Sequence, residues 1–356
     1  MKKHNFNSGP SILPQEVLQQ ASEAILDFNG IGLSILEIGH RTSWFVEVIN
    51  EARALVKELM QLGEDYDVLF LQGGATTQFM QVPLNLLDKD AAAAYCVNGI
   101  WGDKAVKEAK IFGNVNVVSS TKDKNHSYIQ KDFSVPSDNV YLHYTSNNTV
   151  EGTQWHTTPN TDVPLIADMS SDIFSRPVDF SKHSLIYAGA QKNAGAAGVT
   201  IVVVKKDILG KTNRNISPIM DYRKHIEADA LLNTPPVFAV YVSMLTLRWI
   251  KKEGGLVEME KRAKKRADLL YSTLDSLPVF APIVAKEDRS LMNATFTTHN
   301  KELENLFLEE CKQKGMIGVK GHRSVGGLRV SMYNAMPISS VQALVDLMID
   351  FNRRNG

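Results

Sequence analysis

The chain has 356 residues, and its 39 Lys and Arg residues equal its 39 Asp and Glu residues in number, so the formal net charge is zero. This balance excludes a broad basic surface and gives no indication of binding to nucleic acid or to an anionic membrane. Hydrophobic residues make up 44% of the chain, which is ordinary for a globular protein, and a chain of this length usually forms two domains.

Targeting and metal signals are missing from the sequence. No apolar run approaches the roughly 20 residues that a membrane span needs, and no apolar stretch follows the first lysines as in a secretory signal, so we expect a cytoplasmic protein. The two cysteines are Cys96, in an apolar run, and Cys311, in a helical pattern. Neither belongs to a Cys or His spacing typical of a metal site, and we expect no disulfide framework and no bound metal.

The first two thirds of the chain alternate between two apolar periods. Apolar residues at helical spacing predict helices near residues 15–28, 45–59, 77–87 and 103–112. Short apolar runs predict strands at 68–71, 91–97, 115–118, 140–144, 165–167, 185–188 and 199–204. Strands that are apolar on both faces and alternate with helices indicate a mostly parallel sheet in an α/β domain.

The remaining third has a mixed pattern. A long helix over 237–252 is closed by two glycines, and further elements follow as a charged helix near 257–277, a strand at 293–298, a helix at 302–314, a strand at 328–332 and a helix at 341–351. This pattern predicts a smaller α+β domain. We expect a large domain over residues 15–255 and a small domain built from residues 1–14 plus 256–356.

Two side chains near predicted strand ends are candidates for a catalytic or ligand-binding role. Lys192 lies among small residues between two apolar runs, where partial desolvation would lower its pKa and favour attack on a carbonyl, although a solvated turn lysine fits the same pattern. Asp168 ends the run at 165–167, at the edge where open α/β sheets bind ligands. Its carboxylate could pair with a protonated ring nitrogen or could simply cap a turn.

This order of Asp and Lys is used by fold-type I pyridoxal-phosphate enzymes. Along nearly its whole length the sequence resembles the phosphoserine aminotransferases, a branch of the class V aminotransferase family. The resemblance is carried by nine short segments in the same order as in that family. They are NFNSGPS at 5–11, GHRTS at 39–43, QGGATTQF at 72–79, NGIWG at 98–102, NTVEG at 148–152, DMSSD at 168–172, GAQKN at 189–193, NTPP at 233–236 and GHRSVGGLRVSMYNAMP at 321–337.

The resemblance implies pyridoxal 5'-phosphate as the cofactor. Lys192 would bind it covalently and, once released, would carry the proton of the reaction, while Asp168 would pair with the pyridinium nitrogen. The remaining cofactor contacts that the family implies are phosphate contacts from Ala75, Thr76 and Gln191, ring stacking by Trp101 and a hydrogen bond from Thr149 near the ring hydroxyl. Some relatives have an arginine at the position of Thr76, so we expect this site to hold the phosphate with neutral donors.

The same resemblance implies a homodimer, because Asn233 and Thr234 match residues that reach the cofactor phosphate of the neighbouring subunit. It also implies substrates with two anionic groups, for which arginine is the best-suited cation. The substrate-binding candidates are His40, Arg41, His322, Arg323 and Arg329.

The reaction implied is a reversible amino transfer from glutamate to 3-phosphooxypyruvate, which gives O-phospho-L-serine and 2-oxoglutarate in serine biosynthesis. Family members also make 4-phosphooxy-threonine for vitamin B6 synthesis. The alternatives are another class V aminotransferase, such as an alanine–glyoxylate type, a cysteine desulfurase-like lyase, or an α/β binding protein with a decayed site. The positions of Cys96 and Cys311 disfavour the lyase, and the two His-Arg pairs disfavour a substrate as small as alanine.

Overall fold

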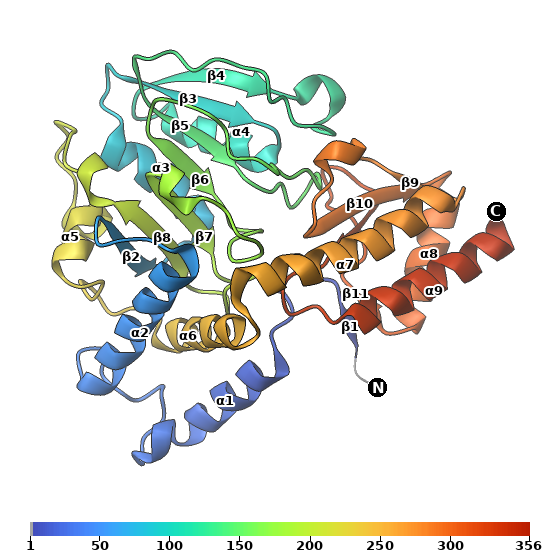
Figure 1. Ribbon diagram of the computed structural model, residues 1–356, viewed down its shortest axis with the longest axis horizontal. Coiled ribbons are helices and arrows are strands. Elements are labelled where there is room, and N and C mark those ends of the chain that lie inside the picture. The colour runs from blue at the N-terminus through green and yellow to red at the C-terminus, as the bar shows by residue number, and fades with distance from the viewer. Residues whose placement is uncertain (1–2) are drawn as a thin grey trace.

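Seven strands form the main sheet of the computed structural model, which describes residues 3–356 (Figure 1). In sheet order they are β2 (Tyr66–Leu71), β8 (Thr200–Lys205), β7 (Leu185–Gly189), β6 (Leu165–Asp168), β5 (Asn139–Thr145), β3 (Ala92–Val97) and β4 (Asn114–Ser120). β8 runs antiparallel to both of its neighbours, and the other four adjacent pairs are parallel. The predicted α/β fold with a mostly parallel sheet is confirmed.

One of the seven strands differs from its predicted environment. The five strands inside the sheet and the edge strand β2 are buried over most of their length, but Ser119 is the one buried residue of β4, and Val117 is 47% exposed. β4 lies at the edge of the sheet and has only β3 as a neighbour. Its apolar run therefore reflects the preference of β-branched residues for strands more than burial on both faces.

The helices of this part of the chain are α1 (Gln15–Leu26), α2 (Ser43–Met60), α3 (Gly74–Leu86), α4 (Ile100–Ala109), α5 (Tyr222–Glu227) and α6 (Val237–Lys252). α6 packs against α1, α2 and α7 and is buried on most sides, which explains its nearly continuous apolar sequence. α4 begins three residues earlier than its apolar pattern predicted, so Trp101 lies in the first turn of a helix and not in a free turn.

The last hundred residues form a second sheet with its own helices. β10 (Asn293–Thr298) lies between β9 (Phe280–Pro282) and β12 (Leu328–Ser331), antiparallel to both. The helices are α7 (Gly255–Ser276), α8 (Lys301–Gln313) and α9 (Ile338–Asn355). Near the N-terminus, β1 (His4–Asn5) pairs with β11 (Met316–Ile317), so this early segment lies with the last part of the chain.

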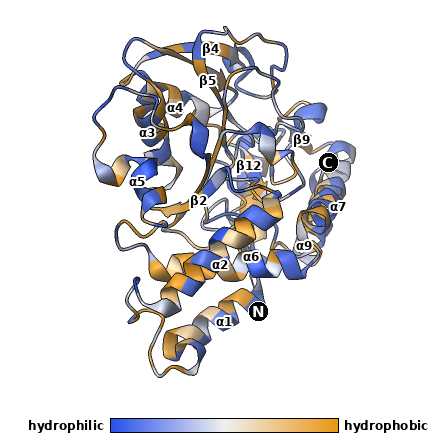
Figure 2. Ribbon diagram, turned by 60° about the vertical axis from the view of Figure 1, so that its left-hand side comes forward, coloured by the Kyte–Doolittle hydropathy of each residue, from blue (hydrophilic) through white to orange (hydrophobic). Residues whose placement is uncertain are grey.

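Two large hydrophobic cores result from this arrangement, with a small third cluster of Ala263, Met292 and Tyr333 beside them. The larger core contains buried residues from Val17 to Met259, and the smaller one contains Phe6 together with residues of α7, α8, α9 and the second sheet. Figure 2 shows mostly hydrophilic residues on the outward sides of α7 and α9. Within residues 3–356, no helix has both the length and the apolar character that crossing a membrane would require.

The smaller core predicts a pair of substitutions with different effects. Phe307 is fully buried, and its ring lies 5.0 Å from that of Phe280 and 5.1 Å from that of Phe351. Phe307→Ala should lower the free energy of unfolding by about 3–5 kcal/mol. The matched control is Leu306→Ala on the same helix, because Leu306 is 44% exposed and should change stability by no more than about 0.5 kcal/mol. Urea unfolding of both variants measures the difference, and equal effects would contradict this description of the core.

Candidate active site

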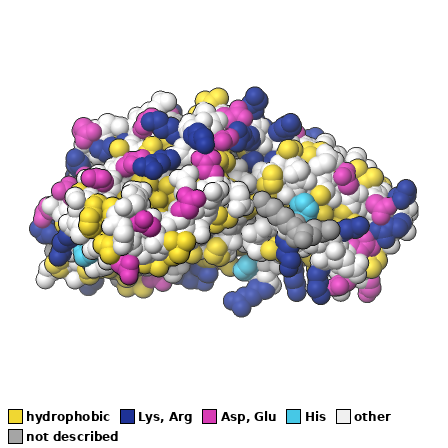
Figure 3. Space-filling view, turned by 90° about the horizontal axis from the view of Figure 1, so that it is seen from below, with side chains coloured by type: hydrophobic (Ala, Val, Ile, Leu, Met, Phe, Trp, Pro, Cys, Tyr) yellow, Lys and Arg dark blue, Asp and Glu magenta, His cyan; other side chains and the backbone are white. Residues whose placement is uncertain are grey.

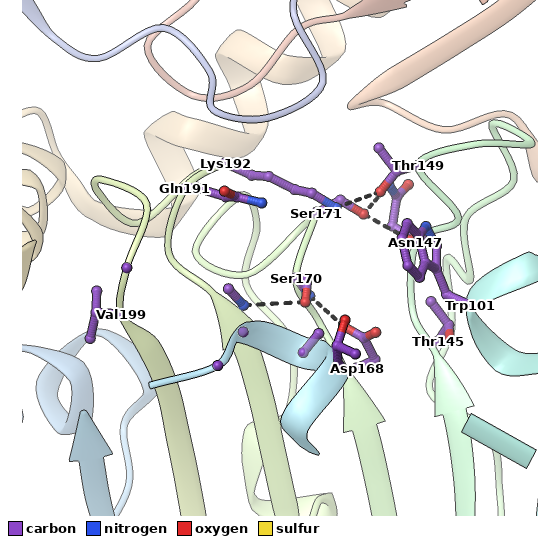
Figure 4. A pocket seen from close by; sticks show the side chains of 16 residues that line it. Trp101, Thr145, Asn147, Thr149, Asp168, Ser170, Ser171, Gln191, Lys192 and Val199 are labelled. Carbon is purple, nitrogen blue, oxygen red and sulfur yellow. Dashed lines mark hydrogen bonds between the residues drawn. The ribbon is translucent and has the colours of Figure 1, made fainter. Parts of the chain in front are cut away.

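A cavity of about 410 Å³ opens at the carboxyl edge of the main sheet (Figure 4). Three parallel strands end there, and α3 and α4 begin there, so polar residues just beyond the strands meet around one space. The lining residues are Gly73, Gly74, Ala75, Thr76, Trp101, Thr145, Asn147, Thr149, Asp168, Ser170, Ser171, Gly189, Gln191, Lys192, Gly198 and Val199.

Lys192 extends across this cavity from the turn after β7. Its Nζ donates a hydrogen bond to Thr149 Oγ1 at 2.7 Å. The backbone of the turn is fixed by Ser11, whose Oγ donates to the carbonyl of Lys192 at 2.5 Å and whose N–H donates to the carbonyl of Gln191 at 2.9 Å. Burial lowers the pKa of Lys192 to about 8, against an opposing effect of the Asp168 carboxylate. The amine therefore gives up its proton far more readily than an exposed lysine does.

Asp168 is the last residue of β6, and its side chain is buried. Its Oδ1 accepts a hydrogen bond from the N–H of Ser170 at 2.9 Å. Among residues 3–356 no Lys, Arg or His forms an ion pair with it. Burial raises the pKa of this carboxyl, while the Ser170 hydrogen bonds and the charge of Lys192 oppose that shift. A protonated nitrogen of a bound ring would supply the positive partner that this buried carboxylate lacks.

The first turn of α3 forms an anion-binding edge. Gly73 and Gly74 have φ angles of 93° and 66°, which favour glycine, and a Cβ on Gly73 would lie 1.9 Å from Thr77 Oγ1. The backbone N–H groups of the first turn of a helix have no partner within the helix, and the positive end of its dipole points the same way. Gly74, Ala75 and Thr76 therefore present donors that suit a phosphate.

Trp101 lies on the wall of the cavity at the start of α4. Its ring centroid is 6.4 Å from that of Phe79 and 4.3 Å from the Nζ of Lys104. The cavity thus contains a lysine with a lowered pKa, a buried carboxylate, a helix N-terminus and an aromatic ring. These are the groups that a planar aldehyde cofactor carrying a ring nitrogen and a phosphate needs, and the residues fit pyridoxal 5'-phosphate.

Arg329 links the second sheet to the cavity. It is only 8% exposed, and its Nη1 and Nη2 donate to the carbonyl of Thr149 at 3.2 Å and to Ser8 Oγ at 2.7 Å. His322 and Arg323 come from the loop before β12 and do not line the cavity. Burial and the charges of Arg329, Arg323 and Lys104 together lower the pKa of His322, which places these cations in one neighbourhood.

The other four predicted residues lie outside this cavity in the single chain. Arg41 is exposed and lines a separate groove beside residues 228–232, and the Nε2 atom of the half-buried His40 has no hydrogen-bond partner within the described residues. Asn233 donates to Gln72 Oε1 at 3.4 Å, just before the α3 turn, and Thr234 is exposed. The structure therefore brings together eight of the predicted residues, seven in the cavity lining and Arg329 beside it.

Comparison with known proteins identifies the family. The model of the family described as Aminotransferase class-V matches residues 3–344. The chain is 56% identical to the phosphoserine aminotransferase of Flavobacterium johnsoniae over 349 residues, which cover 98% of each chain. It is 52% identical to that of Bacteroides thetaiotaomicron, with 99% of each chain covered.

The chain belongs to the class-V aminotransferase family. Solved structures agree with this assignment. The phosphoserine aminotransferase from Bacillus circulans subsp. alkalophilus matches with a TM-score of 0.97 and 42% identity, covering 100% of this chain and 99% of the other. The pyridoxal-phosphate-bound phosphoserine aminotransferase from Trichomonas vaginalis matches with a TM-score of 0.92 and 34% identity, covering 98% of this chain and all of the other.

Several residues at the site of this class-V aminotransferase were not singled out from the sequence. Three serines at the site, Ser11, Ser170 and Ser171, lie inside segments that carry the family resemblance. Their place in these segments could have marked them as candidates. Thr145 is the last residue of β5, just as Asp168 is the last residue of β6, and Asn147 follows two positions later. A polar residue at or just after a strand end was therefore the signal that could have indicated them. Residues 3–356 contain no group of three or more His, Cys, Asp or Glu side chains arranged to hold a metal ion.

The environment of Lys192 predicts its reactivity in the cofactor-free class-V aminotransferase. The rate of acetylation of Lys192 by acetic anhydride should rise with pH around an apparent pKa of about 8. For ordinary exposed lysines the pKa is about 10.4. Asp168→Asn removes a charge that raises the pKa of Lys192, so this variant should shift the profile to lower pH. Pulse labelling followed by peptide mass spectrometry gives both profiles. A Lys192 profile that coincides with those of exposed lysines would refute the proposed effect of burial.

Proposed function

We propose that this class-V aminotransferase is a phosphoserine aminotransferase with pyridoxal 5'-phosphate as its cofactor. It transfers an amino group reversibly from glutamate to 3-phosphooxypyruvate and so forms O-phospho-L-serine and 2-oxoglutarate in the route to serine. The observation that carries the proposal is the shared contact at Thr149, whose hydroxyl accepts from Lys192 and whose carbonyl accepts from Arg329. A cation suited to a substrate carboxylate thus lies beside the reactive amine.

Lys192 acts as the base and acid of the reaction. Pyridoxal 5'-phosphate, when bound, draws electrons from the reacting carbon of the substrate and stabilises the negative charge that develops there. With the cofactor bound, the Lys192 amine, with its lowered pKa, would accept the proton from the reacting carbon of the substrate and donate it again later in the reaction. Thr149 accepts a hydrogen bond from the Nζ atom, and Ser11 fixes the backbone, so the amine keeps one place in the cavity.

The other cavity residues hold the cofactor in this proposal. Asp168 pairs with its ring nitrogen and keeps that nitrogen protonated, because a buried carboxylate favours a positive partner. Ala75 and Thr76 donate to its phosphate from the N-terminus of α3, and Gln191 assists them. Trp101 and Thr149 line the cavity, where Trp101 would stack on the cofactor ring and Thr149 would hydrogen-bond near its ring hydroxyl.

The anionic groups of the substrates meet arginine and histidine side chains. Arg329 binds the α-carboxylate, because it is fixed by Ser8 and Thr149 at the cavity. His322 and Arg323 lie near it and bind the distal phosphate or carboxylate together with His40 and Arg41. The same cations would accept the phosphorylated 3-hydroxy-2-oxobutanoate that leads to 4-phosphooxy-threonine.

A homodimer with shared active sites is part of this proposal. Arg41, Asn233 and Thr234 are placed outside the cavity of their own chain, which supports a role in the site of a second copy. Large hydrophobic side chains are exposed on and around α1 and the start of α2, and Figure 3 shows hydrophobic side chains over the side of the molecule on which α1 lies. These exposed residues are Leu18, Ile25, Leu26, Leu33, Leu36 and Trp44.

We also propose a division into two domains, residues 15–255 and residues 1–14 plus 256–356, and a location in the cytoplasm. The separate hydrophobic cores support the division, because Phe6 packs in the smaller core with α7, α8 and α9. Among the rival functions, a lyase with a reactive cysteine is disfavoured. Cys96 and Cys311 are both buried, and burial raises the pKa of each thiol to about 12.

The substrate proposal is tested by the absorbance of the cofactor-loaded enzyme. Phosphoserine should remove the band of the lysine-bound cofactor, and 2-oxoglutarate should restore it, whereas alanine at the same concentration should leave it unchanged. Lys192→Ala should reduce turnover by at least about 10²–10⁴-fold, because it removes the proton carrier. A band that alanine removes and phosphoserine does not would overturn the substrate assignment and keep the aminotransferase.

Shared sites predict complementation between two inactive variants. The first protein carries Lys192→Ala, and the second carries both Asn233→Ala and Thr234→Ala. In a homodimer of either protein, every active site is damaged. In a mixed dimer one site would contain both defects and the other would contain neither. Mixing the two proteins under conditions that exchange subunits should restore activity to roughly a quarter of the wild-type value if subunits pair randomly. Activity that stays at the level of the separate variants after proven exchange would show that Asn233 and Thr234 act in their own chain.

A further inference from the structure

The first turn of α4, which carries Trp101, is held by a residue from another part of the chain. Residues 98 and 99 join β3 to α4, and Gly99, at the N-cap of α4, has no side chain to accept a hydrogen bond from the helix. Glu151 supplies this acceptor, because its Oε1 accepts from the N–H of Ile100 at 2.8 Å. Ile100 is the residue before Trp101, so the contact fixes the backbone from which the indole projects.

The second carboxylate oxygen of Glu151 lies against the same turn. A Cβ on Gly99 would lie 2.8 Å from Glu151 Oε2 and 2.3 Å from Asn148 Oδ1. The φ angle of Gly99 is 175°, an extended backbone that any residue adopts, so glycine is required here for space. The close approach leaves no room for the turn to move toward Glu151 without displacing it.

Glu151 is almost completely buried, at 4% exposure, so its carboxyl group has little contact with water. Its Oε2 and the Oδ1 of Asn148 both face Gly99, and neither has a hydrogen-bond partner within residues 3–356. Burial raises the pKa of the Glu151 carboxyl, although the Ile100 N–H and the charge of Arg329 oppose that shift. A neutral carboxyl can donate its hydrogen toward Asn148 and still accept from Ile100, which satisfies both groups.

We propose that Glu151 is a positioning residue that sets the place of the Trp101 indole in the cavity. Its backbone carbonyl accepts from Thr295 Oγ1 of β10 at 2.7 Å, a contact that does not involve the carboxylate held against the start of α4. Thr149, which holds Lys192 Nζ, lies two positions earlier in the same segment. The inference rests on the proposed function only in taking Trp101 as the residue that stacks on the cofactor.

Cofactor binding to the cofactor-free protein tests this role without any substrate, so its outcome is independent of whether phosphoserine is the substrate. The dissociation constant of pyridoxal 5'-phosphate can be measured from the quenching of tryptophan fluorescence and checked by equilibrium dialysis. Glu151→Ala should raise it about tenfold. Glu151→Gln should stay within about threefold of wild type, because glutamine keeps an acceptor for Ile100 and gains a donor for Asn148.

Gly99→Ala tests the same contact from the opposite side and leaves Glu151 in place. The added methyl group would collide with Glu151 and Asn148, so this variant should also weaken cofactor binding about tenfold. Thr295→Val is the matched control, because it removes a buried hydrogen bond to the Glu151 backbone and not to its carboxyl. It should lower the melting temperature and leave the dissociation constant within about twofold of wild type.

A double-mutant cycle separates positioning of Trp101 from a general effect on the fold. In the background of Trp101→Ala, Glu151→Ala should cause no further loss of cofactor affinity. The role is overturned if Glu151→Ala keeps its full effect in that background, or if Gly99→Ala binds the cofactor like the wild type. It is also overturned if Thr295→Val weakens binding as much as Glu151→Ala does. If Glu151→Ala does not fold, the Gly99→Ala and Glu151→Gln variants still decide the question.

Discussion

The chemistry of this site depends on keeping a lysine amine out of bulk water while a carboxylate and an arginine lie near it. Burial alone would favour the neutral amine, and Arg329 acts in the same direction, whereas Asp168 favours the charged form. The net effect is a pKa of about 8, low enough for the amine to accept and release protons close to neutral pH. Every other feature of the site either maintains this environment or places a ligand within it.

The sheet topology explains how these groups come together. β5, β6 and β7 are adjacent and parallel, so Thr145, Asp168 and Gly189 end at one edge although they are separated in sequence. β8 returns antiparallel and brings Val199 to that edge as well. The strand ends therefore form one side of the cavity. The turn that carries Lys192 and the first turn of α3 follow directly after strands at this edge.

The sequence was sufficient for features whose signal is local. Strands buried on both faces give apolar runs, and a strand-end aspartate and a lysine among small residues stand out as candidates, as Asp168 and Lys192 did. The local pattern fitted a turn cap and a solvated turn lysine equally well, and the family resemblance decided between these interpretations. Features that depend on distant partners could not be predicted in this way. The hydrogen bond from Arg329 to Ser8 joins residues 321 positions apart, and the one from Ser11 to Lys192 spans 181 positions. β1, β9 and β11 have three residues or fewer, too short for a periodic pattern.

The segment 147–154 shows why such distant contacts matter for an aminotransferase. Thr149 contacts Lys192 and Arg329, and the carbonyls of Glu151 and Gly152 accept from Thr295 and Ser290 of the second sheet region. One short segment therefore contacts the Lys192 amine, Arg329 and the region of the second sheet. Arg329 of β12 and the N–H of Ile100 at the start of α4 are both hydrogen-bonded to this segment. In the proposed function, the substrate cation Arg329 and the stacking residue Trp101 therefore share one support, because Arg329 is bonded to Thr149 and the residue before Trp101 is bonded to Glu151.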